Sequence, residues 1–272
     1  MTMENKLQTE GDFNAAPLVD AGINLSAVFN LSELPPTLYS QIEAVANNSF
    51  KPRQLLLLAH AGNRFWRKLA LSEFSLSAGS SSDPVKTKQS KQNINAISEV
   101  DHPIDEYSIQ QISQHLQHCY PSLNFQILYP SSSDFAKPIG LQQFGKLAGW
   151  HYDSPLKIGI NQTWGTWFAY RVLLLCDGQF TPTEKLQSKP PCTSCSDKPC
   201  ISECPANAVS QTDFDLNCCS QYRASEQSRC SDRCVARLAC PVATEHRYPI
   251  DQIQYHYGRS MQIIRQMFQA KG

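Results

Sequence analysis

The sequence predicts an α+β protein in which a sheet covered by helices is followed by a small cysteine-rich module. Two observations support this fold class. Strand-like and helix-like segments alternate loosely over roughly the first two thirds of the chain, and nine of the eleven cysteines lie between Cys192 and Cys240. A length of 272 residues is sufficient for one large or two modest domains. We therefore expect an α/β domain over residues 1–185 and the module over residues 186–272.

Apolar runs between turn residues predict the elements of the first third. A strand is expected within residues 20–34, because Gly22 precedes a short apolar run that stops at two prolines. Residues 54–59 form a continuous apolar run, typical of a strand buried on both sheet faces, and residues 63–74 are expected to form a helix. Residues 79–95 are polar with almost nothing to bury, so we expect a flexible insert there.

Further elements are expected between this insert and the C-terminus. Asp105 is the expected N-cap of a helix that continues to His118. The strongest strand pattern covers residues 166–176, and apolar residues at helical spacing predict a C-terminal helix within residues 248–271. The shorter elements are a strand at 124–129, a helix at 141–147, a strand at 157–161 and a proline-containing linker at 181–191.

The cysteines of the module form two short runs, and each run closes with a Cys-Pro pair. The first run is Cys192, Cys195, Cys200 and Cys204 before Pro205, and the second is Cys219, Cys230, Cys234 and Cys240 before Pro241. Bacterial ferredoxins hold cubane iron–sulfur clusters with runs of this kind. Zinc is the main alternative, since Cys-x-x-Cys is also a zinc-site element, but zinc does not explain two Cys-Pro endings. Disulfides are a weaker alternative because an odd count leaves one thiol unpaired.

In two-cluster ferredoxins the cysteine before the proline ligates the other cluster. Transferred to this chain, the rule predicts two [4Fe-4S] clusters with exchanged ligands. The ligands of the first are Cys192, Cys195, Cys200 and Cys240, and those of the second are Cys219, Cys230, Cys234 and Cys204.

The second set of ligands leaves alternatives open. Cys219 is preferred to its neighbour Cys218, because residues 214–217 read as a strand that ends just before the pair. The irregular spacing around Cys230 also allows a single cluster with additional structural thiols. Cys119 and Cys176 lie in apolar stripes and are expected to be core residues.

Charge and hydropathy limit the expected partners. Charged residues make up 18% of the chain and the net charge is zero, so no nucleic-acid or anionic-membrane partner is expected. The apolar runs are too short to span a bilayer, and the polar N-terminus does not resemble a secretion signal. A cytoplasmic location is the expectation. The first half contains no dinucleotide-binding glycine motif and no Walker A loop.

Three passages of the first half read as LLLLAHAGNRFW (residues 55–66), HPIDE (102–106) and GTWFAYR (165–171). In order and spacing they resemble the vertebrate cobalamin-processing family, which removes cyanide or alkyl groups from vitamin B12. Such a domain followed by a ferredoxin module is similar to epoxyqueuosine reductase and to the reductive dehalogenases. The string ARLACPV at residues 236–242 is similar to bacterial ferredoxin-like proteins.

This resemblance implies a flavin-reductase-like (nitroreductase-like) sheet-and-helix domain followed by a ferredoxin-like iron–sulfur module. It implies a corrinoid (cobalamin) in the first domain, with flavin as the alternative cofactor, and clusters that deliver single electrons to cobalt. A redox partner protein or a small electron donor would supply them, and a corrinoid or another small molecule would be the substrate. Related folds often form homodimers. The vertebrate family has no ferredoxin module, so cluster electrons would replace its thiol chemistry here.

Three residues are candidates for cofactor binding. Arg171 matches the arginine at the family's thiol-cosubstrate site, and a guanidinium within an apolar strand needs an anionic or carbonyl partner. Trp167 on the same strand is a candidate cofactor wall, with a core role as the simpler alternative. His151 could place an imidazole near a cofactor or act as a hydrogen-bonded structural histidine. No catalytic residue is assigned.

These patterns predict an iron–sulfur oxidoreductase that binds or processes a corrinoid, with two clusters as its electron supply. The first alternative is an electron-transfer ferredoxin whose N-terminal domain only recognises a partner. The second alternative is an enzyme similar to epoxyqueuosine reductase, and the lack of excess positive charge counts against its transfer-RNA substrate.

Overall fold

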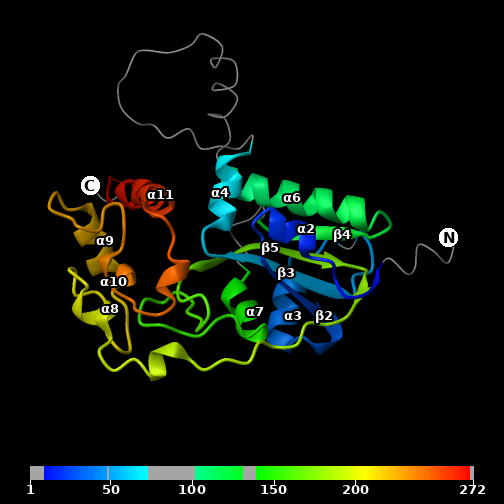
Figure 1. Ribbon diagram of the computed structural model, residues 1–272, viewed down its shortest axis with the longest axis horizontal. Helices are drawn as coiled ribbons and strands as arrows, with labels where there is room; N and C mark the ends of the chain where they lie inside the picture. Colours follow the sequence, from blue (N-terminus) through cyan, green and yellow to red (C-terminus); the bar gives the residue numbers. More distant parts are fainter. Residues whose placement is uncertain (1–8, 48, 73–101, 131–138, 270–272) are drawn as a thin grey trace, which may run out of the picture. The chain divides into compact units, whose positions relative to one another are not determined.

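The computed structural model shown in Figure 1 describes residues 9–47, 49–72, 102–130 and 139–269. The chain forms two compact units. The first unit comprises residues 1–144 and 169–184, and the second comprises residues 145–168 and 185–272. The insert predicted at residues 79–95 lies outside the described residues.

The first unit contains a four-stranded sheet with the order β2-β3-β5-β4. Strand β2 (Leu25–Asn30) runs antiparallel to β3 (Gln54–Ala61), and β4 (Phe125–Tyr129) runs antiparallel to β5 (Phe168–Cys176). All eight residues of β3 are buried, as its continuous apolar sequence predicts. A short parallel pair, β1 (Glu10–Gly11) and β6 (Gln179–Phe180), completes the strands of the described residues.

Helices lie on the sheet of the first unit, so that the described chain is a mixed α/β structure. Helices α2 and α6 pack on each other on one side of the sheet, and α3 lies on the other side (Figure 1). Gly22 precedes β2 with φ +92°, and a Cβ added there would lie 2.4 Å from the Cα of Phe65 in α4. Only glycine allows this close approach of turn and helix. The bounds are α2 (Ala16–Asp20), α3 (Pro36–Glu43), α4 (Arg64–Ala70), α6 (Pro103–Cys119) and α7 (Leu141–Leu147).

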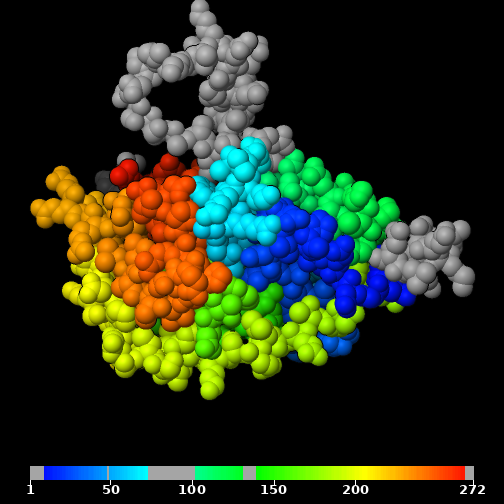
Figure 2. All heavy atoms as spheres, viewed as in Figure 1, coloured from blue at the N-terminus to red at the C-terminus, as the bar shows by residue number. Residues whose placement is uncertain are grey.

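The second unit consists mainly of short helices around the cysteines. The longest, α11 (Ile250–Gln269), packs on α9 (Leu216–Ala224), and α8 (Pro199–Ser202) packs on α10 (Val235–Leu238). Short 3₁₀ turns lie at Pro191–Thr193 and Thr244–His246. Figure 2 shows the chain near residue 200, in yellow, in continuous contact with the orange chain near residue 235. No helix in the described part of the chain has both the length and the apolar character needed to cross a membrane.

Three predicted features differ from the structure. Residues 157–161 do not form a strand; Ile160 and Asn161 only make isolated bridges to Tyr152 and Gly165. Residues 214–217 do not form an approach strand, because Asp215 caps helix α9 and its side chain accepts a hydrogen bond from the Cys218 N–H at 2.9 Å. Asp105 lies in the first turn of α6, whose N-cap is His102 and whose first residue is Pro103. A proline favours that position because it needs no N–H partner there.

Candidate metal centre

The first cavity of the second unit is bordered by four cysteines from both cysteine runs. They are Cys192, Cys195, Cys200 and Cys240. The space among the lining residues, which is partly open to solvent, is about 310 Å³, and the other walls are Pro155, Ile160, Lys198, Pro199, Pro241 and Val242. Sequence reasoning predicted these four cysteines as one ligand set, and the structure brings all four together.

The backbone around Cys200 places its thiol at this cavity. Lys198 adopts a left-handed conformation (φ +41°) and Pro199 then begins the single-turn helix α8, which contains Cys200. A proline suits the first helical position. Cys204 follows the end of α8 and belongs to the other cavity. Cys200 within α8 and Cys204 just after it therefore border different cavities, so the two sites lie close together.

The second cavity is bordered by the remaining four predicted ligands. They are Cys204, Cys219, Cys230 and Cys234, and the open space among the lining residues is about 860 Å³. Cys219 lines the cavity from α9, whereas the adjacent Cys218 is exposed. Cys234 is the N-cap of α10, and its Sγ accepts a hydrogen bond from the Arg237 N–H at 3.4 Å.

The two Cys-Pro turns have the same local geometry. In each, the residue three positions after the cysteine adopts a left-handed conformation, at Asn207 (φ +50°) and at Ala243 (φ +50°). Helices α8 and α10, which precede these turns, pack on each other. A small apolar core lies among the thiols and consists of Leu156, Cys204, Ala208, Val209 and Ala236. The two halves of the module thus form a pseudo-repeat that exchanges its last cysteines.

All eleven cysteines are described and none forms a disulfide. Among the described residues, no group of three or more His, Cys, Asp or Glu side chains has the geometry to hold a single metal ion. A cubane core is larger than one ion and its four thiolate ligands stand around it. The cavity borders supply four cysteines each, so the donor set of each fits such a core.

Burial of the thiols opposes their ionisation. Burial, followed by the neighbouring cysteines, raises the pKa of Cys192 and of Cys219 to about 11 each. Burial also raises the pKa of Cys200, Cys230 and Cys240. Four clustered thiolates repel one another, and a bound cation removes this repulsion. Metal loading at these sites must therefore release protons.

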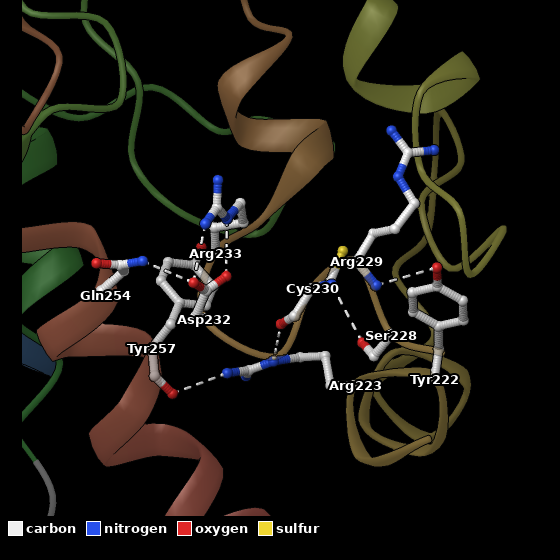
Figure 3. Close-up of polar contacts among 9 residues, drawn as sticks. All are labelled: Tyr222, Arg223, Ser228, Arg229, Cys230, Asp232, Arg233, Gln254 and Tyr257. Carbon is white, nitrogen blue, oxygen red and sulfur yellow. Dashed lines mark hydrogen bonds and ion pairs between the residues drawn. The ribbon is translucent and has the colours of Figure 1, made fainter. Parts of the chain in front are cut away.

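Three arginines line the second cavity, Arg223, Arg233 and Arg237, and Figure 3 shows the polar contacts of the first two. Arg223 lines it from α9, donates from Nε to the Cys230 carbonyl at 3.2 Å, and donates to the Tyr257 carbonyl at 3.1 Å. Its guanidinium also donates to Ser260 Oγ at 2.7 Å and lies 5.0 Å from the Tyr257 ring centroid. Arg223 therefore ties the Cys230 loop to helix α11. Asp232 pairs with Arg233 at 2.7 Å beside the same cavity.

Trp167 is part of the second unit, where it supports an arginine of the same cavity. The guanidinium of Arg237 lies 4.3 Å from the Trp167 ring centroid, and Tyr248 meets this ring edge-on at 5.4 Å. Arg237 also donates to the Thr166 hydroxyl at 3.2 Å and lines the second cavity. Trp167 is 1% exposed. In this structure its contacts are those of a core residue that holds Arg237.

The other two candidate cofactor residues lie in different units. Arg171, on β5 of the first unit, is buried; its Nε donates to His60 Nδ1 at 2.9 Å, and its guanidinium lies 5.2 Å from the Phe65 ring centroid. His151 is buried in the second unit, where burial and the nearby Lys146 lower its pKa. Arg171 thus belongs to the first unit, and Trp167 and His151 belong to the second.

Sequence reasoning missed two groups of lining residues. Arg223 carried no motif, and Arg237 lay within the ARLACPV string without a role of its own, because nothing local distinguishes an arginine that folds onto a cavity from a solvated one. Pro155 and Ile160 line the first cavity, and Leu156 and Ile158 line the second. This segment precedes the cysteines by more than thirty residues, so only the tertiary fold shows the association.

No protein-family model and no curated protein sequence matches the chain. Among solved structures, epoxyqueuosine reductase from Streptococcus thermophilus is 12% identical with a TM-score of 0.45, over 85% of this chain and 65% of that one. The C. elegans B12-trafficking protein CblC is 12% identical with a TM-score of 0.45, over 89% of this chain and 88% of that one. A reductive dehalogenase is 13% identical with a TM-score of 0.47, over 90% of this chain and 33% of that one.

This chain therefore spans less than two thirds of the epoxyqueuosine reductase and one third of the dehalogenase. Similar solved structures include the three classes of protein that the sequence resembles. Likeness of this degree does not assign an activity to the chain.

Proposed function

We propose that this chain is a redox protein with two [4Fe-4S] clusters, whose electrons serve a corrinoid in the first unit. One observation carries the iron–sulfur part. Eight cysteines lie in two sets of four, and each set takes three members from one run and its last member from the other. This exchange is the ligand pattern of two-cluster ferredoxins, so the second unit is proposed to be ferredoxin-like.

When bound, the clusters would supply one-electron transfer at low potential. The chain's own residues would ligate, shield and orient them. Cys200 lies in α8 and Cys204 follows the helix end, only four residues later in the chain, which keeps the two sites adjacent. Arg223 and Arg237 place positive charge at the second cavity, where it would offset the charge of four thiolates.

The corrinoid part rests on the three passages that resemble the cobalamin-processing family, at residues 55–66, 102–106 and 165–171. We propose a nitroreductase-like fold for the first unit, which contains the first two passages and residues 169–171 of the third. His60 of the first passage and Arg171 of the third form a hydrogen bond within that unit. The resemblance thus includes two residues that contact each other across neighbouring strands. Flavin is the alternative cofactor.

Anaerobic reconstitution followed by iron and sulfide analysis tests the module. About eight of each per chain are expected for two cubane clusters, and stoichiometric zinc in their place would refute the iron–sulfur assignment. Titration with hydroxocobalamin tests the first unit. The expected result is a change in the visible spectrum and co-elution of the corrinoid on gel filtration, and the absence of both would refute the corrinoid part alone.

One observation favours the second candidate, an electron-transfer ferredoxin whose first unit only recognises a partner protein. The Arg171 guanidinium already has His60 and Phe65 as partners, so a structural role accounts for its burial. In that case the clusters assemble but the corrinoid titration is negative. A positive titration excludes this candidate.

A further inference from the structure

We propose that residues 152–160, the bridging loop, form a shared apolar wall that sets the reduction potential of each cluster separately. The inference rests on the proposed iron–sulfur function. It concerns residues outside both cysteine runs, in a segment that the ligand pattern does not indicate. Neighbouring side chains of this short loop line different cavities.

The lining residues divide between the two cavities. Pro155 and Ile160 border the first cavity, and Leu156 and Ile158 border the second. Every other lining residue of either cavity comes from residues 192–257. All four side chains are apolar, and Leu156 (8% exposed) and Ile160 (1% exposed) are buried. The bridging loop is therefore a wall between both sites and solvent.

Hydrogen bonds at its base fix the conformation of the bridging loop. Tyr152 and Ile160 exchange two backbone hydrogen bonds of 3.0 Å each. Within the loop, Ser154 Oγ donates to the Ile158 carbonyl at 2.7 Å. Lys157 adopts φ +55°, and its Nζ donates to the Thr212 carbonyl at 3.1 Å. A left-handed lysine costs on the order of 1 kcal/mol or more and persists only where its surroundings impose it.

His151 and Gly159 lie in close contact at the base of the bridging loop. A Cβ added to Gly159 would lie 2.5 Å from His151 Nδ1. Any larger residue at position 159 would clash with the imidazole, which is itself buried and packs against the loop. His151 therefore contacts the bridging loop and lines neither cavity.

The wall affects the potential because reduction adds a negative charge to a site that already carries four thiolates. Water stabilises the more highly charged form, and an apolar wall withholds that stabilisation. Opening the wall with a small polar side chain is expected to favour the reduced form. The potential of the adjacent cluster should rise, and that of the other cluster should stay constant.

The test compares Ile158→Ser with Pro155→Ser in the full-length reconstituted protein. Both side chains are half-buried, and they lie three residues apart in the same loop. Spectroelectrochemical titration with EPR detection measures both potentials. Cys192→Ser and Cys219→Ser assign each signal to its site. Lys157→Arg, whose side chain lines neither cavity and keeps its charge, is the matched control.

Ile158→Ser should increase the ratio of reduced to oxidised second cluster at least tenfold at fixed solution potential, which equals a rise of about 59 mV for one electron. Pro155→Ser should act on the first cluster alone, and Lys157→Arg on neither. Loss of iron from only the adjacent site also supports the division of the wall. Equal shifts of both clusters, or none, would overturn it.

Different results would contradict the proposed function and this inference. If the unsubstituted protein takes up no iron and sulfide on reconstitution, the proposed function is wrong. If both clusters assemble but neither loop substitution changes their reduction potentials, only the role of the bridging loop is wrong.

Discussion

Arg223 should be the side chain that couples the second cysteine cavity to the C-terminal helix. It donates to the Cys230 carbonyl (3.2 Å), the Tyr257 carbonyl (3.1 Å) and Ser260 Oγ (2.7 Å), and it stacks on the Tyr257 ring. We predict that Arg223→Gln destabilises the second unit. A hydrogen bond from a charged donor contributes roughly 1.5–3 kcal/mol and a cation–π contact about 0.5–1 kcal/mol.

These contributions are not additive, because one half-buried side chain makes all of the contacts and the shorter glutamine can still make some of them. The expected loss in the free energy of unfolding is therefore about 2–4 kcal/mol for the whole network. Urea unfolding of the metal-free protein, followed by tryptophan fluorescence, measures it directly. Trp167, in the same apolar cluster as Tyr257, is a local reporter.

Arg229 provides the matched control. It is exposed, six residues along the chain, and its side chain points away from the network in Figure 3. Arg229→Gln removes the same charge and should change the unfolding free energy by less than about 0.5 kcal/mol. If the two variants unfold at the same urea concentration, then Arg223 acts only through its charge and the coupling to α11 is wrong.

Three other predictions concern backbone, protonation and ligands. Gly165→Ala should cost about 1–3 kcal/mol, because Gly165 has φ +57° and a Cβ would lie 2.4 Å from the Val242 carbonyl oxygen; Gly258→Ala in α11, with nothing within 4 Å, should be neutral or stabilising in the same denaturation assay. Burial lowers the pKa of His151 below its ordinary 6.5, so the stability that His151 contributes is present above pH 6.5 and is lost as the pH falls, because the unfolded chain then binds the proton more readily. When the free energy of unfolding in urea is measured at a series of pH values below 6.5, His151→Gln should show a smaller pH dependence than the unsubstituted protein. An equal pH dependence of the two proteins would contradict this. Cys204→Ser should lower the iron of the second cluster more than that of the first, and Cys218→Ser should leave iron content and EPR signals unchanged; iron lost equally from both sites would argue against the exchanged ligands.

The pattern of apolar residues predicted those elements whose residues are buried in a regular pattern along the chain. The apolar run at residues 54–59 forms strand β3, and residues 141–147 form α7 with the expected bounds. The cysteine sets could also be predicted, since the Cys-Pro rule depends on connectivity rather than on distance. The structure places each set of four around one cavity.

One error arose where tertiary contacts decide the local structure, and another arose where a local capping signal was overlooked. Ile158 and Ile160 are spaced like residues on one face of a strand, yet they line different cavities. The chain turns over residues 155–158, where Lys157 has a positive φ, so no strand forms. Residues 214–217 alternate like a strand, but the Asp215 side chain caps a helix. That aspartate before Leu216 was an available signal for an N-cap. No local signal could have placed Arg223 beside Cys230.

The exchange of last cysteines has a consequence for assembly. Each run provides three thiols to one cavity and one thiol to the other, so neither cavity is complete without both halves of the module. Occupying one site would fix Cys204 or Cys240 in place and reduce the conformational entropy lost when the neighbouring site fills. Iron incorporation should therefore be cooperative, with chains carrying either both clusters or neither and few half-loaded molecules between them.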